Sequence, residues 1–491
     1  MAGTGATGDL GRDPEVAALS PHSRSVAPGT LFFALRGTRA DGHDFAAAAA
    51  RAGAVAVVAE RPVDAGATPV LIAPNARRAM ALAAANFFGH PGERMLLAGI
   101  TGTKGKTTVS YLVESAAEAA GVPCGVIGTV TWRWPGASRP ASHTTPESTE
   151  LQSALAEMAR AGARLAVLEV SSHALAQERV AGLAFRATAF LNLSRDHLDY
   201  HRDFDDYYQA KRRLLAEHLV PDGQAVVNAG DGHGARLAAE LQAAGRRVWR
   251  FGAAGAELAA REARVGLAGI EAVLETPRGD LTVRSPLTGS YNLENLLAAA
   301  GLALGLGLEP GAVARGLSAS TGAPGRLERI EKGGVAAFVD YAHTDAALAA
   351  ACAALRALGP RRLVVVFGCG GDRDRGKRPL MGRAAGAAAD LVVVTSDNPR
   401  GEDPLSIIQA ILPGVKEAGL SRLSPAEARA GQRGYLAVPD RREAIALALA
   451  TARPGDAVLI AGKGHEDYQI VGAERRHFDD REEARRALGL T

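Results

Sequence analysis

Residues 99–108, with the sequence GITGTKGKTT, join an apolar run at 95–100 to a stretch that begins a helix near Thr107. Strand, glycine loop and helix in this order are typical of loops that hold nucleotide phosphates. The glycines let backbone N–H groups face the phosphates, and the helix N-terminus adds positive charge. Lys106 offers a further positive charge, and the Thr107 hydroxyl can contact Mg²⁺. The spacing departs from the usual phosphate loop because Ile100 stands where its first glycine would be, so the match runs through Gly102 instead. The segment predicts a site for ATP or GTP.

Apolar runs typical of strands alternate with alanine-rich helical stretches along the whole chain, which predicts an α/β fold with mostly parallel sheets. A chain of 491 residues has room for roughly three domains. Turn-rich segments at 89–93 and 321–325 predict domains over residues 1–91, 92–321 and 322–491. The strands that we expect cover residues 31–35, 55–59, 70–73, 95–100, 165–170, 187–193, 336–339, 363–367, 391–395 and 457–461.

The charge balance favours small-molecule ligands. There are 56 Lys and Arg residues against 53 Asp and Glu, a net charge of +3, which is too small to indicate a nucleic-acid or polybasic membrane surface. The three cysteines, Cys124, Cys352 and Cys369, form no CxxC pair, so we expect neither a disulfide framework nor structural zinc. The N-terminus lacks a signal-peptide pattern, and no run of about 18 apolar residues occurs. We expect a cytoplasmic protein with no nucleic-acid or membrane partner.

Glu169 is a candidate metal ligand near the end of the apolar run 165–170. Metal-binding acids in such sheets tend to lie at the carboxyl ends of strands that neighbour the phosphate loop. A carboxylate there is costly to bury without a partner, and a cation could be that partner. The alternative is a strand-end acid that faces solvent.

The segment 194–201 contains four titratable side chains that could contact metal or phosphate, although a plain polar loop fits the spacing equally well: Asp196, His197, Asp199 and His201. In the helix that follows, six residues share one stripe, namely Phe204, Tyr207, Tyr208, Lys211, Leu214 and Leu215. Lys211 is anomalous among these residues, because lysine is almost never fully buried without a partner. The alternative is that its stem follows apolar surface while the ammonium reaches water. Arg212 and Arg213 lie off the stripe and are expected to face solvent.

Together with further blocks in one order, these segments resemble the Mur ligase family. The blocks are Ser-Arg with PGTLFFAL and ADGHDF (23–45), HTTPE (143–147), EVSSHALAQERV (169–180), NLSRDHLDYH (192–201), YNLENLLAA (291–299), PGRLERI (324–330), VDYAHT (339–344), GCGGDRDRGKRPLM (368–381), DNPR (397–400) and AGKGHEDYQIVG (461–472). The resemblance implies an N-terminal domain for a uridine nucleotide, a central ATP-binding domain of phosphate-loop type, and a Rossmann-like C-terminal domain for an amino acid.

The resemblance also implies an activity. The chain is expected to be an ATP-dependent amide ligase that adds meso-diaminopimelate to the D-Glu γ-carboxylate of UDP-MurNAc-L-Ala-D-Glu. The reaction would pass through an acyl phosphate in cytoplasmic peptidoglycan precursor synthesis, with Mg²⁺ as cofactor and a monomeric enzyme. DNPR ties the resemblance to diaminopimelate rather than lysine. A lysine-adding or a folate-type polyglutamate ligase would share the ATP loop and Glu169, and the DNPR and GHE pair is what distinguishes them. A nucleotide-gated binding protein and a simple phosphotransferase are the alternatives from other classes.

The resemblance assigns roles residue by residue. The catalytic set is Lys106, Glu169, His197 and Lys211, and the metal set is Thr107, Glu169, His197 and Lys211 as a carbamate. The ATP set is Gly102, Thr103, Lys104, Gly105, Lys106, Thr107, Thr108, Asn292, Arg326, Asp340 and His343. The UDP-MurNAc-dipeptide set is Ser23, Thr38, Arg39, Ala40, Thr144, Thr145, Ser171, Gln177 and Arg179. The diaminopimelate set is Arg373, Asp397, Asn398, Pro399, Arg400, Gly462 and Glu466. Two residues depart from the family pattern, His22 before Ser-Arg and Asp345 after His-Thr.

Overall fold

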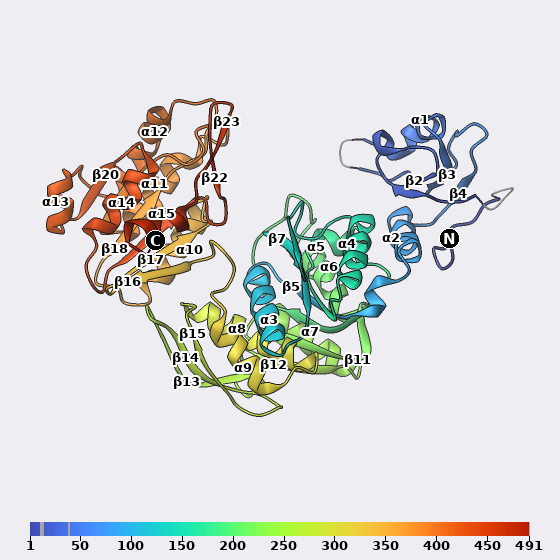
Figure 1. Ribbon diagram of the computed structural model, residues 1–491, viewed down its shortest axis with the longest axis horizontal. Coiled ribbons are helices and arrows are strands. Elements are labelled where there is room, and N and C mark those ends of the chain that lie inside the picture. The colour runs from blue at the N-terminus through green and yellow to red at the C-terminus, as the bar shows by residue number, and fades with distance from the viewer. Residues whose placement is uncertain (10–13, 38–39, 491) are drawn as a thin grey trace. The chain divides into compact units, whose positions relative to one another are not determined.

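The computed structural model describes residues 1–9, 14–37 and 40–490. The chain forms two compact units. Unit 1 comprises Met1–Ala259, Thr276–Gly279 and Leu297–Gly316, and unit 2 comprises Ala260–Glu275, Asp280–Leu296 and Leu317–Thr491. Both units combine helices with sheets (Figure 1). In the described part of the chain, no helix is long and apolar enough to cross a lipid bilayer.

The first ninety residues of unit 1 carry a four-stranded parallel sheet in the order β1-β2-β3-β4. Its elements are β1 (Ala18–Ser20), η1 (Ser23–Ser25), β2 (Thr30–Phe33), η2 (Gly42–Phe45), α1 (Ala46–Arg51), β3 (Ala54–Ala59), β4 (Val70–Ile72), α2 (Ala76–Phe87) and η3 (Pro91–Arg94). The predictions for β2, β3 and β4 are confirmed to within two residues at each end. Strand β1 was not predicted, because its three residues are too short a run to show a period.

The larger sheet of unit 1 has eight strands in the order β12-β11-β10-β5-β9-β6-β7-β8. Strands β12 to β6 pair in parallel, and β7 and β8 add an antiparallel edge. The strands are β5 (Leu96–Thr101), β6 (Cys124–Ile127), β7 (Thr131–Trp134), β8 (Ala137–Pro140), β9 (Leu165–Glu169), β10 (Phe185–Phe190), β11 (Leu219–Asn228) and β12 (Arg247–Phe251). The helices are α3 (Lys106–Ala119), α4 (Ser148–Arg160), α5 (Ser172–Ala176), α6 (Phe204–Ala216) and α7 (Gly232–Ala243).

Strand β10 ends three residues before the predicted end at 193. Beyond Phe190 the backbone leaves the β10–β11 ladder and turns toward the phosphate loop, where the Leu191 N–H donates to the Thr101 carbonyl and the Thr103 N–H to the Asn192 carbonyl. Residues 191–193 are apolar or uncharged in sequence, so they read as a strand. Their hydrogen bonds instead support the site described below.

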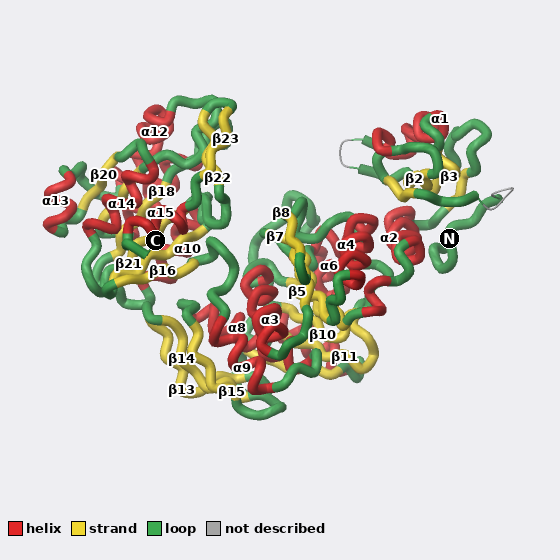
Figure 2. The backbone as a smooth tube through the Cα atoms, viewed as in Figure 1, coloured by secondary structure: helices red, strands yellow, loops and turns green. Residues whose placement is uncertain are grey.

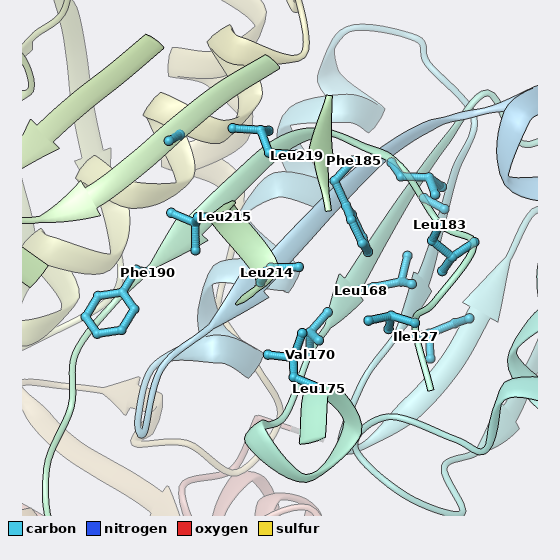
Figure 3. Packing of buried hydrophobic residues seen from close by; sticks show 14 of the residues in the cluster. Ile127, Leu168, Val170, Leu175, Leu183, Phe185, Phe190, Leu214, Leu215 and Leu219 are labelled. Atoms are coloured by element: carbon cyan, nitrogen blue, oxygen red, sulfur yellow. The ribbon is translucent and has the colours of Figure 1, made fainter. Parts of the chain in front are cut away.

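A continuous apolar core lies between the large sheet of unit 1 and the helices that cover it. Figure 3 shows Phe185 and Phe190 of β10 beside Leu214 and Leu215 of α6, all buried. Burying one such side chain stabilises a fold by about 1.5–3 kcal/mol. This packing fixes α6 against the sheet, close to the carboxyl end of β5.

Unit 2 contains a six-stranded sheet in the order β16-β17-β21-β18-β19-β20. Only β16 runs antiparallel to its neighbour. Its elements are β16 (Glu328–Lys332), β17 (Val335–Asp340), α10 (Asp345–Arg356), β18 (Leu363–Phe367), α11 (Lys377–Ala388), β19 (Leu391–Val394), α12 (Pro404–Glu417), α13 (Pro425–Ala430), β20 (Gly434–Ala437), α14 (Arg441–Thr451), β21 (Ala457–Ala461) and α15 (Asp480–Ala487). The strands predicted at 363–367 and 457–461 are confirmed residue for residue.

A second, antiparallel sheet has the order β13-β14-β15, from β13 (Ala259–Gly266), β14 (Gly269–Glu275) and β15 (Leu281–Ser285). Figure 2 shows these strands as a separate group. Two helices follow, α8 (Ser290–Gly305) and α9 (Pro310–Ala319), and a hairpin of β22 (Tyr468–Val471) and β23 (Glu474–His477) lies near the C-terminus. This antiparallel sheet was not predicted from the sequence.

Candidate functional site

The phosphate loop has the conformation that its sequence predicts. It connects the end of β5 to α3, which begins at Lys106, one residue earlier than expected. Gly105 caps the helix in the left-handed region at φ 90°, a conformation that a side chain would strain. The Lys106 ammonium donates to the carbonyls of Gly102 at 2.8 Å and Thr103 at 3.1 Å. The predicted lysine therefore lies directly over the loop.

Glu169 does not face solvent. It ends β9 with 1% of its surface exposed, and its Oε2 accepts from the hydroxyls of Thr107 at 3.0 Å and Thr129 at 2.8 Å. The Thr129 backbone N–H donates to the Glu169 Oε1 at 3.0 Å. The predicted pair of Thr107 and Glu169 is thus brought together. Thr129 is a contact that sequence reasoning missed, because it follows β6 in a short polar turn that carries no motif.

The loop after β10 supports the phosphate loop through its second residue, Asn192. The Asn192 side chain accepts from the Lys104 N–H at 2.8 Å and donates to the Lys104 carbonyl at 3.1 Å, as a backbone strand would. The Tyr207 hydroxyl lies 3.1 Å from the Thr103 hydroxyl, and burial raises the pKa of Tyr207 to about 12. Asn192 and Tyr207 therefore hold the loop from two sides.

Lys211 is buried, with 1% of its surface exposed, so its ammonium does not reach water. The Nζ donates to the Gly102 carbonyl at 2.9 Å and lies 4.6 Å from the centre of the Tyr207 ring. Burial, followed by the positive charge of Lys106, lowers the pKa of Lys211 well below its usual value. The prediction that this lysine shares the apolar face of α6 is confirmed.

The two arginines beside Lys211 were expected to face solvent, but both are half-buried and ion-paired, with 35% of the Arg212 side chain and 22% of the Arg213 side chain exposed. Arg212 pairs with Glu240 at 2.6 Å, and Arg213 pairs with Glu178 at 2.7 Å and Glu217 at 2.9 Å. Both lie off the apolar stripe, as predicted. Glu240 of α7 and Glu178 after α5 nevertheless pair with them, and periodicity within one helix carries no information about those other elements.

The four titratable residues of segment 194–201 do not form one cluster. His201 is buried and its Nδ1 lies 3.3 Å from the Asp206 carboxylate, whereas Asp196, His197 and Asp199 stay exposed. The His197 ring contacts the His173 ring, with centroids 4.8 Å apart. Burial lowers the pKa of His173 to about 4. Across the described ranges, no three His, Cys, Asp or Glu side chains are grouped so that they alone could hold a metal ion.

The residues expected to contact the dipeptide part of the precursor form one network around the end of β9. The Thr145 hydroxyl donates to the Glu169 carbonyl at 2.8 Å and accepts from the Ser171 N–H at 3.0 Å. Arg179 donates to the Thr145 carbonyl at 2.7 Å and to the Gln177 side chain at 2.8 Å. The Thr144 hydroxyl lies 3.1 Å from that of Thr129. This network leads from the predicted substrate residues to the loop that holds Glu169.

The residues expected near the uridine end lie elsewhere in unit 1. Ser23 begins η1, and Ala40 is exposed just before η2. Thr38 and Arg39 lie outside the described residues. The departure at His22 occupies the N-cap of η1, where its N–H donates to the Ser20 hydroxyl at 3.0 Å.

The remaining residues of the ATP set belong to unit 2. The buried Asn292 of α8 donates to the Thr288 carbonyl at 2.8 Å. Asp340 accepts from the backbone N–H groups of Leu327 and Ala342, both at 2.8 Å, and burial raises its pKa. The Tyr341 ring lies 5.3 Å from the Arg326 guanidinium and 4.6 Å from the His343 ring. Arg326, Asp340 and His343 are thus gathered about Tyr341, which was not predicted.

The diaminopimelate set gathers at the carboxyl ends of β18, β19 and β21 in unit 2. The Asn398 amide donates to the Glu466 carboxylate at 3.0 Å. Arg400, in the left-handed region at φ 52°, donates to the Gly371 carbonyl at 3.0 Å. A Cβ built on Gly370 would lie 2.9 Å from the Arg400 guanidinium and 3.6 Å from the Arg373 side chain, so both arginines border this glycine.

The three further members of this set, Asp397, Pro399 and Gly462, lie in the same place. Asp397 is 7% exposed, and a Cβ built on Gly462 would lie 2.5 Å from its carboxylate, so the bare glycine leaves room for that group. Pro399 follows Asn398 in the same loop and is buried. Burial, followed by the negative charge of Asp397, raises the pKa of Glu466. The site presents two guanidinium forks and two carboxylates, which are complementary to a ligand with both kinds of charge.

Three family models match this chain: the Mur ligase family catalytic domain at residues 15–90, the Mur ligase middle domain at 100–303, and the Mur ligase glutamate ligase domain at 325–464. A protein of Geobacter metallireducens named UDP-N-acetylmuramoyl-L-alanyl-D-glutamate–2,6-diaminopimelate ligase is 47% identical over 485 residues, 96% of this chain and 94% of that protein. One of the same name from Gloeobacter violaceus is 47% identical over 482 residues, 97% and 94% of the two chains.

A solved structure with that name is similar over 97% of this chain and 95% of its own, with a TM-score of 0.73 and 35% identity. The predicted α/β class with three such domains is therefore confirmed.

Proposed function

Because this chain belongs to the Mur ligase family, we propose that it is an ATP-dependent amide ligase of peptidoglycan precursor synthesis. It joins meso-diaminopimelate to the D-Glu γ-carboxylate of UDP-MurNAc-L-Ala-D-Glu. Relatives named UDP-N-acetylmuramoyl-L-alanyl-D-glutamate–2,6-diaminopimelate ligase match nearly the whole chain at 47% identity. The observation that carries the choice of amino acid is the group of Asp397, Asn398, Arg400 and Glu466, gathered at the strand ends of unit 2.

The chemistry explains why no protein nucleophile is required. A carboxylate resists attack by an amine because its carbon is electron-rich and oxide cannot leave. Transfer of the ATP γ-phosphoryl group to the D-Glu γ-carboxylate forms an acyl phosphate and releases ADP. The diaminopimelate amine then attacks the acyl carbon, and phosphate leaves as the amide forms. The protein positions the reactants and offsets their charge, and Lys106 over the phosphate loop is suited to this role.

We propose that Thr107 and Glu169 hold one Mg²⁺, and that His197 contributes to a second. The Thr107 hydroxyl and the Glu169 carboxylate lie 3.0 Å apart. Both supply oxygen ligands, which a hard cation such as Mg²⁺ prefers. When bound, Mg²⁺ would offset the phosphate charge during transfer. Thr129 orients the Glu169 carboxylate by its hydroxyl and its backbone N–H.

Lys211 is proposed to react with CO₂, losing a proton and becoming a carbamate anion. Only the neutral amine adds CO₂, and burial favours that form by lowering the pKa of Lys211. The reaction would also place a negative charge beside the positive charge of Lys106. The Lys211 Nζ donates to the Gly102 carbonyl, so this side chain lies next to the phosphate loop.

We assign the three substrates to three domains, residues 1–91 for the uridine nucleotide, 92–321 for ATP and 322–491 for the amino acid. In the last of these, Arg373 and Arg400 would bind the distal carboxylate of diaminopimelate, and Asp397 and Glu466 its ammonium. Lysine lacks that carboxylate, so these contacts favour diaminopimelate over lysine.

An ADP-release assay with diaminopimelate and lysine in parallel tests the proposal. We expect release that requires Mg²⁺, the UDP-linked dipeptide and diaminopimelate together, with lysine a poor substitute. Replacing Arg400 with Ala should raise the KM for diaminopimelate far more than the KM for ATP. Release with lysine at an equal rate would assign a lysine-adding ligase instead, and release without any amino acid would indicate a phosphotransferase.

A further inference from the structure

We propose that Lys463 is a positioning residue that sets the geometry and charge of the diaminopimelate pocket, an inference that rests on the proposed function. Lys463 lies between Gly462 and Gly464 in the loop after β21 and has no exposed surface (0%). Its Nζ donates to the Asn398 Oδ1 at 3.0 Å and to the Tyr468 carbonyl at 2.6 Å. A buried ammonium with such fixed partners orients the groups around it.

The first consequence concerns the Asn398 amide. Its Oδ1 accepts from Lys463 and, at 3.0 Å, from the Ile470 N–H. Both partners are donors only, so the oxygen must face them and the amide nitrogen must face the opposite side. There the nitrogen donates to the Glu466 carboxylate at 3.0 Å. Lys463 and the Ile470 N–H therefore together exclude the flipped amide, which would present an oxygen to the Glu466 carboxylate.

The second consequence concerns charge. The Lys463 Nζ lies 3.8 Å from the Asp397 carboxylate and 3.9 Å from the Glu466 carboxylate. The negative charge of Asp397 contributes to the raised pKa of Glu466, whereas Lys463 opposes that shift. The Lys463 Nζ thus lies between the two carboxylates, where a positive charge favours the ionised form of Glu466, and an ionised carboxylate is the form that binds an ammonium group of the amino acid.

The third consequence concerns the backbone of the pocket. By bonding the Tyr468 carbonyl, Lys463 holds the start of β22. Two residues further on, the Ile470 carbonyl accepts from the Arg400 N–H at 3.0 Å. Lys463 thus connects the loop after β21, the DNPR loop and β22. The residue does not touch substrate in this scheme, and it acts through Asn398, Asp397 and Glu466.

Steady-state kinetics of Lys463→Met in the full chain test the inference. Losing a charged hydrogen-bond donor to a buried amide should raise the KM for diaminopimelate by about 10- to 100-fold. The KM values for ATP and the UDP-linked dipeptide should stay within about twofold, because all the contacts of Lys463 lie in the amino-acid pocket. Lys463→Gln, which keeps a donor but not the charge, should fall between wild type and Lys463→Met. Lys416→Met, at an exposed lysine of α12, is the matched control and should change none of these values.

A common rise in all three KM values, or an unchanged diaminopimelate KM in folded Lys463→Met, would overturn the inference. A crystal structure of the wild-type chain keeps the test independent of variant folding and of activity. The inference requires the Lys463 Nζ within hydrogen-bond distance of Asn398, with the amide nitrogen toward Glu466. A lysine turned to solvent would refute it. Wild-type enzyme that is inactive with diaminopimelate would instead refute the proposed function. The crystal structure would then still decide separately whether Lys463 orients the Asn398 amide.

Discussion

Gly128, which follows β6, borders the acid of the ATP site. A Cβ built there would lie 2.2 Å from the Glu169 Oε1, and its φ is not in the left-handed region, so the closest clash is with the Glu169 side chain and not with backbone. Gly128→Ala should therefore displace Glu169 from Thr107 and Thr129 without unfolding the chain. Misplacing a catalytic group by about 1 Å can cost roughly 100-fold, and we expect a fall in kcat of that order.

The test measures kcat at saturating substrate concentrations, and it measures the melting temperature of each variant to check that the fold is intact. Gly232→Ala is the control, because a Cβ at Gly232 meets nothing within 4 Å. Gly128→Ala with wild-type kcat would show that Glu169 need not hold its observed position.

The raised pKa of Glu466 predicts a pH dependence. The protonated carboxyl is neutral and cannot pair with an ammonium group, so lowering the pH should raise the KM for diaminopimelate. Because burial and Asp397 raise the pKa, this rise should begin above the pH range of an ordinary glutamate, whose usual value is 4.5. Glu466→Gln should have a high KM at every pH. A wild-type KM for diaminopimelate that does not change as the pH is lowered toward the usual glutamate value would contradict the prediction. The KM for the UDP-linked dipeptide, measured over the same pH values, is the reference.

Some of these residues could be predicted from the sequence and others could not, because only residues in a regular helix or strand follow a period that reveals burial. Lys211 could be found because it interrupts an apolar stripe on a helix, where period and burial are linked. Lys463 is just as buried, but its loop is rich in glycine and has no period. Thr129 acts through one hydroxyl and one backbone N–H, and nothing in its neighbours marks it out.

At the scale of elements, Arg441 ties the start of α14 to three other segments of unit 2. It is wholly buried and pairs with Asp480 of α15 through two bonds of 2.7 Å. It also donates to the Ser396 carbonyl at 3.1 Å and the Ala461 carbonyl at 3.0 Å, just before the DNPR and GKGHE loops. Arg441 thus holds the bases of both loops that carry the amino-acid pocket.

Arg441→Met should destabilise unit 2 by about 3–5 kcal/mol, because it leaves the Asp480 carboxylate buried and unpaired. Replacing Asp480 with Leu as well should restore part of that loss. Denaturant unfolding followed by far-UV circular dichroism measures both. A single variant as stable as wild type would show that the pair contributes little.

Helices and strands were predictable where apolar runs typical of strands alternated with helical stretches. Strands β18 and β21 are continuous apolar runs of five residues, fully buried in a parallel sheet, and their bounds were predicted. The antiparallel sheet was missed because β13 has three charged residues among its eight and none that is fully buried, and because β14 alternates buried residues with exposed or half-buried ones over only seven positions. The departure at Asp345 is also local. It sits in the first turn of α10 after the Thr344 cap, where a negative charge is favourable.

On the scale of the whole molecule, two proposed ligand sets fall in different units. The described residues of the UDP-MurNAc-dipeptide set lie in unit 1, and the diaminopimelate set lies in unit 2. All three tryptophans, Trp132, Trp134 and Trp249, are also in unit 1. Tryptophan fluorescence therefore follows the unfolding of unit 1 alone, whereas calorimetry follows both units.

This division predicts which transition each ligand shifts. A ligand at 100 times its Kd stabilises the unit that binds it by about 2.7 kcal/mol. The UDP-linked dipeptide should raise the temperature of the fluorescence transition, and diaminopimelate should raise a calorimetric transition that tryptophan does not report. Arg441→Met should lower only the second transition, which identifies it as that of unit 2. Diaminopimelate that moved the tryptophan transition and left the other in place would mean that the amino acid binds in unit 1, against the assignment of Arg400 and Glu466 to its pocket.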